Sequence, residues 1–229
     1  MGDKMDIEKI SENKTNEVLV NEIFKSIQGE SSQAGRPCIF VRLRGCPLRC
    51  VWCDSEYAFY EGAAQSFDTI LKQVKDLNCN LVEVTGGEPL AQKNCIPLLK
   101  FLLEQKFELM LETSGAFAID DVPKAVRIIM DIKAPGSGEE KRNRWENLKT
   151  LKEHFDEIKI VIKDRADFEY AVKVCEEHNL LSRFTVLLSA VQGGLSHAEL
   201  ADWILDSKLP FRFQLQMHKA VWPSKERAF

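Results

Sequence analysis

The sequence has few features that would direct the chain to a membrane, out of the cell or onto a nucleic acid. No apolar run approaches the ~18 residues that a bilayer-spanning helix needs. The first sixteen residues are polar and charged, without the apolar core of a secretory signal peptide. Basic residues are not in excess, because 31 Lys and Arg stand against 35 Asp and Glu, for a net charge of −4. We therefore expect a cytoplasmic protein with no membrane or nucleic-acid partner.

Histidine is scarce and the cysteines do not form an even set. The chain has four His and seven Cys, an odd number that argues against a disulfide framework. Three thiols are clustered in the spacing C-x3-C-x2-C, at Cys46, Cys50 and Cys53, with no His nearby in sequence. Structural zinc and an ordinary 4Fe–4S cluster each take four protein ligands. Three thiolates on a 4Fe–4S cluster would leave one iron open for a substrate or cofactor; zinc binding and unliganded thiols remain as alternatives.

Strand-like and helix-like apolar patterns alternate along the chain. The expected strands are 18–27, 38–44, 81–84, 108–111, 127–131, 157–162, 184–191 and 211–217, the last carrying His218 at its end. The expected helices are 68–78, 94–106, 142–152, one through Phe168 and Cys175, and one that starts at the capping box Ser196-x-x-Glu199. This alternation predicts an α/β fold, a partial, open (βα)6-type barrel of mainly parallel strands. Residues 1–16 are expected to be a flexible tail, and residues 17–229 a single domain.

Polar and glycine-rich motifs follow several of these strands, at the edge where parallel α/β folds bind ligands. Gly86-Gly87-Glu88 follows one strand, and its glycines allow a ligand to approach the backbone closely. Ser114 and Asp131-Ile132-Lys133 follow two later strands. Arg42 precedes the cysteine loop, and a guanidinium is a natural bidentate partner for a carboxylate. We expect the cysteine loop and these motifs to share one site at the carboxyl ends of the strands.

The cysteine spacing, with an aromatic residue directly before the last Cys, resembles the cluster loop of radical S-adenosylmethionine enzymes. The resemblance implies a 4Fe–4S cluster held by Cys46, Cys50 and Cys53, whose open iron binds S-adenosylmethionine. It also implies a set of residues that contact this cofactor. They are Trp52, Cys53, Asp54, Gly86, Gly87, Glu88, Ser114, Asp131, Ile132 and Lys133.

Within that family, the chain most resembles the synthases that convert 6-carboxy-5,6,7,8-tetrahydropterin to 7-carboxy-7-deazaguanine, in 7-deazapurine (queuosine) biosynthesis. The matching pieces are Ser26–Glu30, Phe40–Cys46, Cys53-Asp54-Ser55 and Gln216–Lys219. The residues that this resemblance assigns to a pterin substrate are Ile27, Gln28, Gly29, Glu30, Arg42, Thr85 and His218. It further implies Mg2+ bound by the Ser55 hydroxyl, an electron donor such as flavodoxin or ferredoxin, and a homodimer. Two departures are Ser31, where many relatives have Gly, and Ser55, where the hydroxyl residue is often Thr.

Two other functions remain open at this level. A glycyl-radical activase of the same superfamily has the same cysteine spacing, but it would need to dock a large protein. A zinc-stabilised binding module would use the thiols without redox chemistry.

Overall fold

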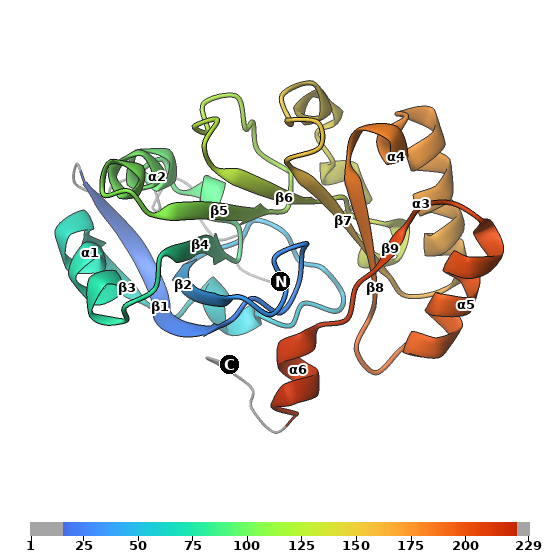
Figure 1. Cartoon of the computed structure of the whole chain (residues 1–229), viewed down its shortest axis with the longest axis horizontal. Coiled ribbons are helices and arrows are strands. Elements are labelled where there is room, and N and C mark those ends of the chain that lie inside the picture. Colours follow the sequence, from blue (N-terminus) through green and yellow to red (C-terminus); the bar gives the residue numbers. More distant parts are fainter. Residues whose placement is uncertain (1–15, 224–229) are drawn as a thin grey trace, which may run out of the picture.

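The computed structural model describes residues 16–223, which form one open, twisted sheet flanked by helices (Figure 1). Its nine strands lie in the order β3-β1-β2-β4-β5-β6-β7-β8-β9. They are β1 (Glu17–Ile27), β2 (Pro37–Leu43), β3 (Ala63–Ser66), β4 (Leu81–Gly86), β5 (Glu108–Thr113), β6 (Arg127–Asp131), β7 (Glu157–Ile162), β8 (Thr185–Ala190) and β9 (Arg212–Phe213). From β2 to β9 every neighbouring pair is parallel, whereas β1 is antiparallel to both β2 and β3. The expected partial, open barrel of mainly parallel strands is confirmed.

Most of the connections between parallel strands contain helices. The α-helices are α1 (Phe67–Asp76), α2 (Cys95–Glu104), α3 (Arg165–Glu177), α4 (Leu180–Arg183), α5 (His197–Ser207) and α6 (Met217–Val221). The 3-10 turns are η2 (Glu56–Phe59), η3 (Pro89–Ala91), η4 (Pro135–Ser137), η5 (Glu140–Arg142) and η6 (Trp145–Lys149). Side-chain caps start three helices: Ser66, Asp164 and Ser196 each accept a hydrogen bond from a backbone N–H three residues later. None of the helices within residues 16–223 is long and apolar enough to cross a lipid bilayer.

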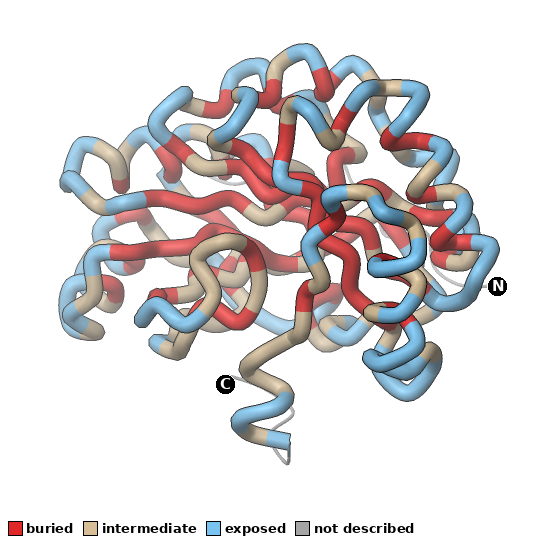
Figure 2. The backbone as a smooth tube through the Cα atoms, turned by 45° about the vertical axis from the view of Figure 1, so that its right-hand side comes forward, coloured by how far each residue is buried: buried red, intermediate tan, exposed pale blue. Residues whose placement is uncertain are grey.

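The two faces of the sheet have different chemistry. The outer face packs against the helices in the main apolar core, and Figure 2 shows buried residues concentrated along the central strands. The inner face has a small apolar layer of Cys38, Leu81, Met110 and Ile129. The next inward positions toward the carboxyl ends of these strands carry polar or charged side chains on β4, β5 and β6, because side chains alternate between the two faces of a strand. The apolar layer therefore supports a polar site above it.

The loop between β1 and β2 closes the lower end of the barrel. Arg36 pairs with Glu108 at the start of β5, with Nη2 and Oε2 2.6 Å apart. The backbone N–H of Ser32 donates to Glu157, at the start of β7, over 2.9 Å. This loop therefore crosses beneath the open barrel, and its first residues, from Gln28, face the interior.

Two expected elements are wrong. The segment 142–152 is no α-helix but contains the short turn η6, where buried Asn147 donates to the carbonyls of Gly115 and Phe117. The last strand ends at Phe213 instead of 217, and His218 lies in α6. Hydrogen bonds to distant residues divert this segment, including Met217 N–H to the Gly29 carbonyl over 2.9 Å. The predicted tail, residues 1–16, lies outside the described residues except for Asn16.

Candidate functional site

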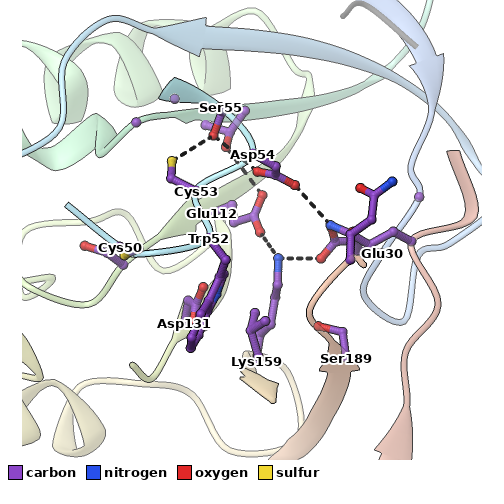
Figure 3. A pocket seen from close by; sticks show the side chains of 18 of the residues that line it. Glu30, Cys50, Trp52, Cys53, Asp54, Ser55, Glu112, Asp131, Lys159 and Ser189 are labelled. Atoms are coloured by element: carbon purple, nitrogen blue, oxygen red, sulfur yellow. Dashed lines mark hydrogen bonds and ion pairs between the residues drawn. The ribbon is translucent and has the colours of Figure 1, made fainter. Parts of the chain in front are cut away.

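A cavity of about 520 Å³ opens at the carboxyl ends of the parallel strands. Its walls come from the ends of β2 and β4 to β8, from the cysteine loop and from the C-terminal segment (Figure 3). This volume lies within the ~300–1,000 Å³ range of small-molecule sites. The cysteine loop and the strand-end motifs Gly86-Gly87, Ser114 and Asp131 all line this one cavity.

The cysteine loop directly follows β2 and borders one side of the cavity. Cys46, Cys50 and Cys53 all line it, and they pack with Leu48 and Phe59 in a small apolar cluster. Gly87 allows this packing, because a Cβ there would lie 2.6 Å from the Cβ of Cys46. The loop is thus held close to the end of β4.

The arrangement of the three thiols distinguishes a zinc site from an iron–sulfur cluster. Among residues 16–223, no group of three or more His, Cys, Asp or Glu side chains converges tightly enough to hold a single metal ion. The donor set is soft and limited to three thiols around one apolar wall, which fits a polynuclear iron–sulfur cluster and not a four-ligand zinc site. Burial raises the pKa of Cys46 to about 12 and also raises the pKa of Cys50 and of Cys53. Ligation by these residues therefore releases protons, since only the thiolate binds metal.

Glu88 lies beneath the cavity and not in its lining. The side chain is fully buried, and one oxygen accepts from the backbone N–H and the hydroxyl of Ser114, over 2.6 and 2.5 Å. The other oxygen, Oε1, accepts from the Leu90 N–H and the Thr113 hydroxyl. Burial raises the pKa of Glu88, although these hydrogen bonds oppose the shift. The residue therefore braces the Gly86-Gly87 turn against the end of β5, which leaves the glycines and Ser114 to face the cavity.

The end of β6 contributes an acidic and a basic group. Asp131 and Lys133 both line the cavity, and Lys133 Nζ lies 2.8 Å from Asp131 Oδ2. The other carboxylate oxygen, Oδ1, is buried without a hydrogen-bond partner among the described residues, so it is available to a ligand donor. Ile132 between them points into the outer core and does not line the cavity.

Three charged side chains, those of Lys159, Glu112 and Glu30, meet in the cavity. Sequence reasoning did not assign Lys159 to the site. Lys159 lies between Glu112, 2.8 Å from its Nζ, and Glu30, with which it also forms an ion pair (Figure 3). Burial acts to lower the pKa of Lys159, but the two carboxylates outweigh it and hold that pKa well above its usual range. The only signal in the sequence is one Lys in the apolar strand of β7, Glu157-Ile158-Lys159-Ile160.

Arg42 is oriented before any ligand binds. Its Nε donates to Glu22 over 2.9 Å, and the Tyr57 hydroxyl donates to the same Glu22 oxygen over 3.0 Å. Its Nη1 lies 3.5 Å from the Gly86 carbonyl. Arg42 lines the cavity, so the guanidinium edge that Glu22 does not use can face a ligand there.

The start of the β1–β2 loop and the C-terminal segment form the opposite side of the cavity. Gln28, Gly29 and Glu30 line it together with His218. A Cβ on Gly29 would overlap the His218 ring, so glycine permits this contact. Lys219 pairs with Asp54 over 2.6 Å and thereby ties α6 to the cysteine loop. Burial lowers the pKa of His218, which favours a neutral ring.

The Ser55 hydroxyl lines the cavity beside the last cysteine. Its Oγ lies 3.9 Å from Cys53 Sγ and 3.5 Å from Asp54 Oδ1. Hydroxyl and carboxylate oxygens are the hard ligands that Mg2+ accepts.

Most of the predicted site residues line this one cavity. They are Gln28, Gly29, Glu30, Arg42, Cys46, Cys50, Trp52, Cys53, Asp54, Ser55, Thr85, Gly86, Gly87, Ser114, Asp131, Lys133 and His218. Ile27, Glu88 and Ile132 do not line it. Lining residues that sequence reasoning did not assign to the site include Phe40, Tyr57, Glu83, Lys159 and Lys219.

Comparisons with known proteins identify the family of the chain. Residues 40–177 match the family model of the radical SAM superfamily. The chain is 43% identical over 218 residues to the 7-carboxy-7-deazaguanine synthase of Koribacter versatilis, covering 89% of this chain and 96% of that protein. It is 43% identical over 207 residues to the synthase of the same name from Chlorobaculum tepidum, covering 89% and 93%.

The fold is also found in a solved structure. The crystal structure of QueE from Escherichia coli superposes with a TM-score of 0.73, at 21% identity, over 93% of this chain and 99% of that one. At this identity the match supports the fold alone, whereas the two sequence relatives establish the family. The chain belongs to the 7-carboxy-7-deazaguanine synthase family of the radical S-adenosylmethionine superfamily.

Proposed function

We propose that the protein converts 6-carboxy-5,6,7,8-tetrahydropterin to 7-carboxy-7-deazaguanine and ammonia by a radical ring contraction. The observation that carries the proposal is the single cavity in which the three-cysteine loop faces Gln28–Glu30, Arg42, Thr85 and His218. Sequence identity of 43% to proteins named for this product supports the synthase over a glycyl-radical activase. All atoms of the substrate are accounted for by the product and ammonia, so the reaction requires no added oxidant.

The family's cofactors are a 4Fe–4S cluster and S-adenosylmethionine. When bound, they supply a 5′-deoxyadenosyl radical, formed after one electron splits the sulfonium. Cys46, Cys50 and Cys53 would hold the cluster. Gly86, Ser114 and Asp131 would then contact the methionine and ribose groups of the cofactor, since their polar atoms line the same wall. The free oxygen of Asp131 suits a hydroxyl or ammonium donor.

The substrate would lie between this wall and the C-terminal segment. Arg42, held by Glu22, would bind the carboxylate, and its fixed orientation reduces the entropy lost on binding. The Ser55 hydroxyl would bind Mg2+ that also contacts the substrate. Lys159, fixed between Glu30 and Glu112, would present a full positive charge to the ring system.

The remaining parts of the proposal concern partners. A small redox protein such as flavodoxin or ferredoxin would deliver the electron, and the enzyme would act as a homodimer in the cytoplasm. The electron donor and the homodimer rest on the family resemblance, and they are tested by reconstitution with the redox protein and by sizing the protein in solution.

The proposed function is tested by anaerobic incubation of the iron-reconstituted protein with the tetrahydropterin, S-adenosylmethionine and a reductant. Mass spectrometry should detect 7-carboxy-7-deazaguanine, and the Cys46→Ala variant should give none. Deoxyadenosine release without the deazapurine, in a protein that carries about four irons, would show a radical enzyme with another substrate and would refute the proposal.

A further inference from the structure

Glu83 is an ionisable group that borders the small apolar layer of the inner face. It lies on β4, in register with Phe40 on β2 and Met110 on β5. Phe40 itself stacks on Phe24, with ring centroids 5.1 Å apart. Glu83 is 1% exposed, yet it lines the floor of the cavity. A carboxyl group in such surroundings is costly unless it is hydrogen-bonded, so its partner is informative.

That partner is Gln28, which is held by hydrogen bonds of its side chain and of its backbone. Its Nε2 donates to Glu83 Oε2 over 2.5 Å, and its Oε1 accepts from the Glu30 N–H over 2.5 Å. Its backbone N–H donates to Arg36 and its carbonyl accepts from Gly35, both over 2.8 Å. Gln28 therefore connects the Glu83 side chain on β4 to the backbone of Glu30 in the cavity wall; we call this connection the strut.

The strut ends at Glu30, where three parts of the site meet. The Glu30 carboxylate pairs with Lys159 and accepts from Gln216 over 2.8 Å, in the segment that leads into α6. Lys159 in turn pairs with Glu112 at the end of β5. The position of Glu30 thus depends on Gln28, and the orientation of Gln28 depends on the acceptor that Glu83 provides.

We propose that Glu83 is a positioning residue for the substrate. Through Gln28 it holds Glu30 and the adjoining Lys159–Glu112 pair in the positions in which they contact the pterin ring. The inference rests on the proposed function and deepens it. Residues on the cofactor side, such as Gly86 and Ser114, are held by other contacts, including those of Glu88 with Ser114. Loss of Glu83 should therefore affect the substrate and not S-adenosylmethionine.

Two substitutions at position 83 separate positioning from packing. Glu83→Met keeps a similar volume but removes the acceptor, whereas Glu83→Gln keeps a carbonyl oxygen that can accept from Gln28. Losing one buried hydrogen bond corresponds to about a tenfold effect. Glu83→Met should raise the KM for the tetrahydropterin by about that factor, with the KM for S-adenosylmethionine within about twofold of the wild type. Glu83→Gln should bring the KM for the tetrahydropterin most of the way back to the wild-type value.

A second buried glutamate provides the matched control. Glu157 is also 1% exposed and holds the same loop through Ser32, but it does not line the cavity. Glu157→Met should lower the thermal unfolding temperature without the selective rise in the KM for the pterin. An equal rise in Glu157→Met would show a general loosening of the loop and would overturn the proposal.

The experiment measures kcat and both KM values in the three variants and the wild type, together with equilibrium binding of fluorescent 6-carboxypterin, a stable oxidised relative of the substrate. Weaker binding of 6-carboxypterin to Glu83→Met, recovered in Glu83→Gln, supports the proposal. Unchanged pterin KM and binding in Glu83→Met, or parallel increases in both KM values, overturn it. If the wild-type enzyme forms no deazapurine, that result counts against the proposed function instead. Failure of the positioning proposal and failure of the proposed function are therefore distinguishable.

Discussion

Glu88 follows the paired glycines and invites assignment as a cofactor ligand, but its surroundings predict a structural role. Replacement by Gln keeps one oxygen and places an NH2 group at the other position. The two carboxylate oxygens accept from different backbone N–H groups, those of Leu90 and Ser114. Either orientation of the amide therefore leaves one buried N–H facing a donor.

The loss of stability in Glu88→Gln follows from this one N–H group that is left without an acceptor. A buried polar group that loses its partner costs about 1–3 kcal/mol, and bonds to a charged acceptor are stronger than neutral ones. Burial raises the pKa of Glu88, so removing the charge offsets part of this cost. We expect Glu88→Gln to lose about 2 kcal/mol of stability, which lowers the unfolding temperature by roughly 4–8 °C in a domain of this size.

The assay is thermal unfolding of anaerobically purified protein, with S-adenosylmethionine affinity measured in parallel. The exposed Glu146→Gln serves as control and should change stability by less than about 0.5 kcal/mol. A wild-type unfolding temperature in Glu88→Gln, combined with weaker cofactor binding, would place Glu88 in direct contact with the cofactor and refute this reasoning.

Four further outcomes are expected. Replacing Cys46 by Ala should abolish iron binding and turnover, and iron content should survive in Cys38→Ala; equal iron loss in both would contradict the three-ligand set. Ser55→Ala should keep the cluster but lose the response of turnover to Mg2+, and an unchanged response would remove this hydroxyl from the metal site. Arg42→Lys should bind the tetrahydropterin more weakly while still releasing deoxyadenosine without substrate, because a point charge replaces a bidentate donor; equal affinity would place the substrate carboxylate elsewhere. Burial raises the pKa of Glu83 far above 4.5, with Glu112 adding to the shift and Lys159 opposing it, so the folded state keeps a proton that the unfolded state releases. The stability of the wild type should therefore fall relative to that of Glu83→Gln as pH rises above about 4.5, by at most ~1.4 kcal/mol per pH unit. Denaturant titrations at several pH values measure this difference in stability. A difference that does not vary with pH would contradict the raised pKa of Glu83.

The sequence alone determined the fold class and predicted where the site lies, because both depend on local signals. Alternating strand and helix patterns with short connections require parallel strands, and parallel strands bring their carboxyl ends to one edge. The motifs at Cys46, Gly86 and Ser114 follow such strands, so their meeting could be predicted without coordinates. The cysteine spacing lies within one short loop and needs no tertiary information.

The tertiary structure decided which charged groups face each other. Lys159 is 47 residues from Glu112 in sequence, yet the two pair at 2.8 Å. No periodic pattern reveals such a pair, since a single charged residue in an apolar strand is equally compatible with an exposed edge. The C-terminal segment shows the same limit: its apolar pattern favoured a strand, but contacts with Gly29 and Asp54 fold it into α6.

Glu88 and Glu83 show why side-chain direction could not be predicted. Both lie on or directly after β4, and both are buried glutamates. Glu83 points inward because strand positions alternate, which places it under the cavity beside Gln28. Glu88 lies beyond the strand, where the glycine turn places its carboxylate behind the cavity lining, hydrogen-bonded to Ser114. Local signals place Glu88 next to the glycine motif, but only the path of the backbone after Gly86 decides that Glu88 lies behind the cavity lining, while Glu83 borders the cavity.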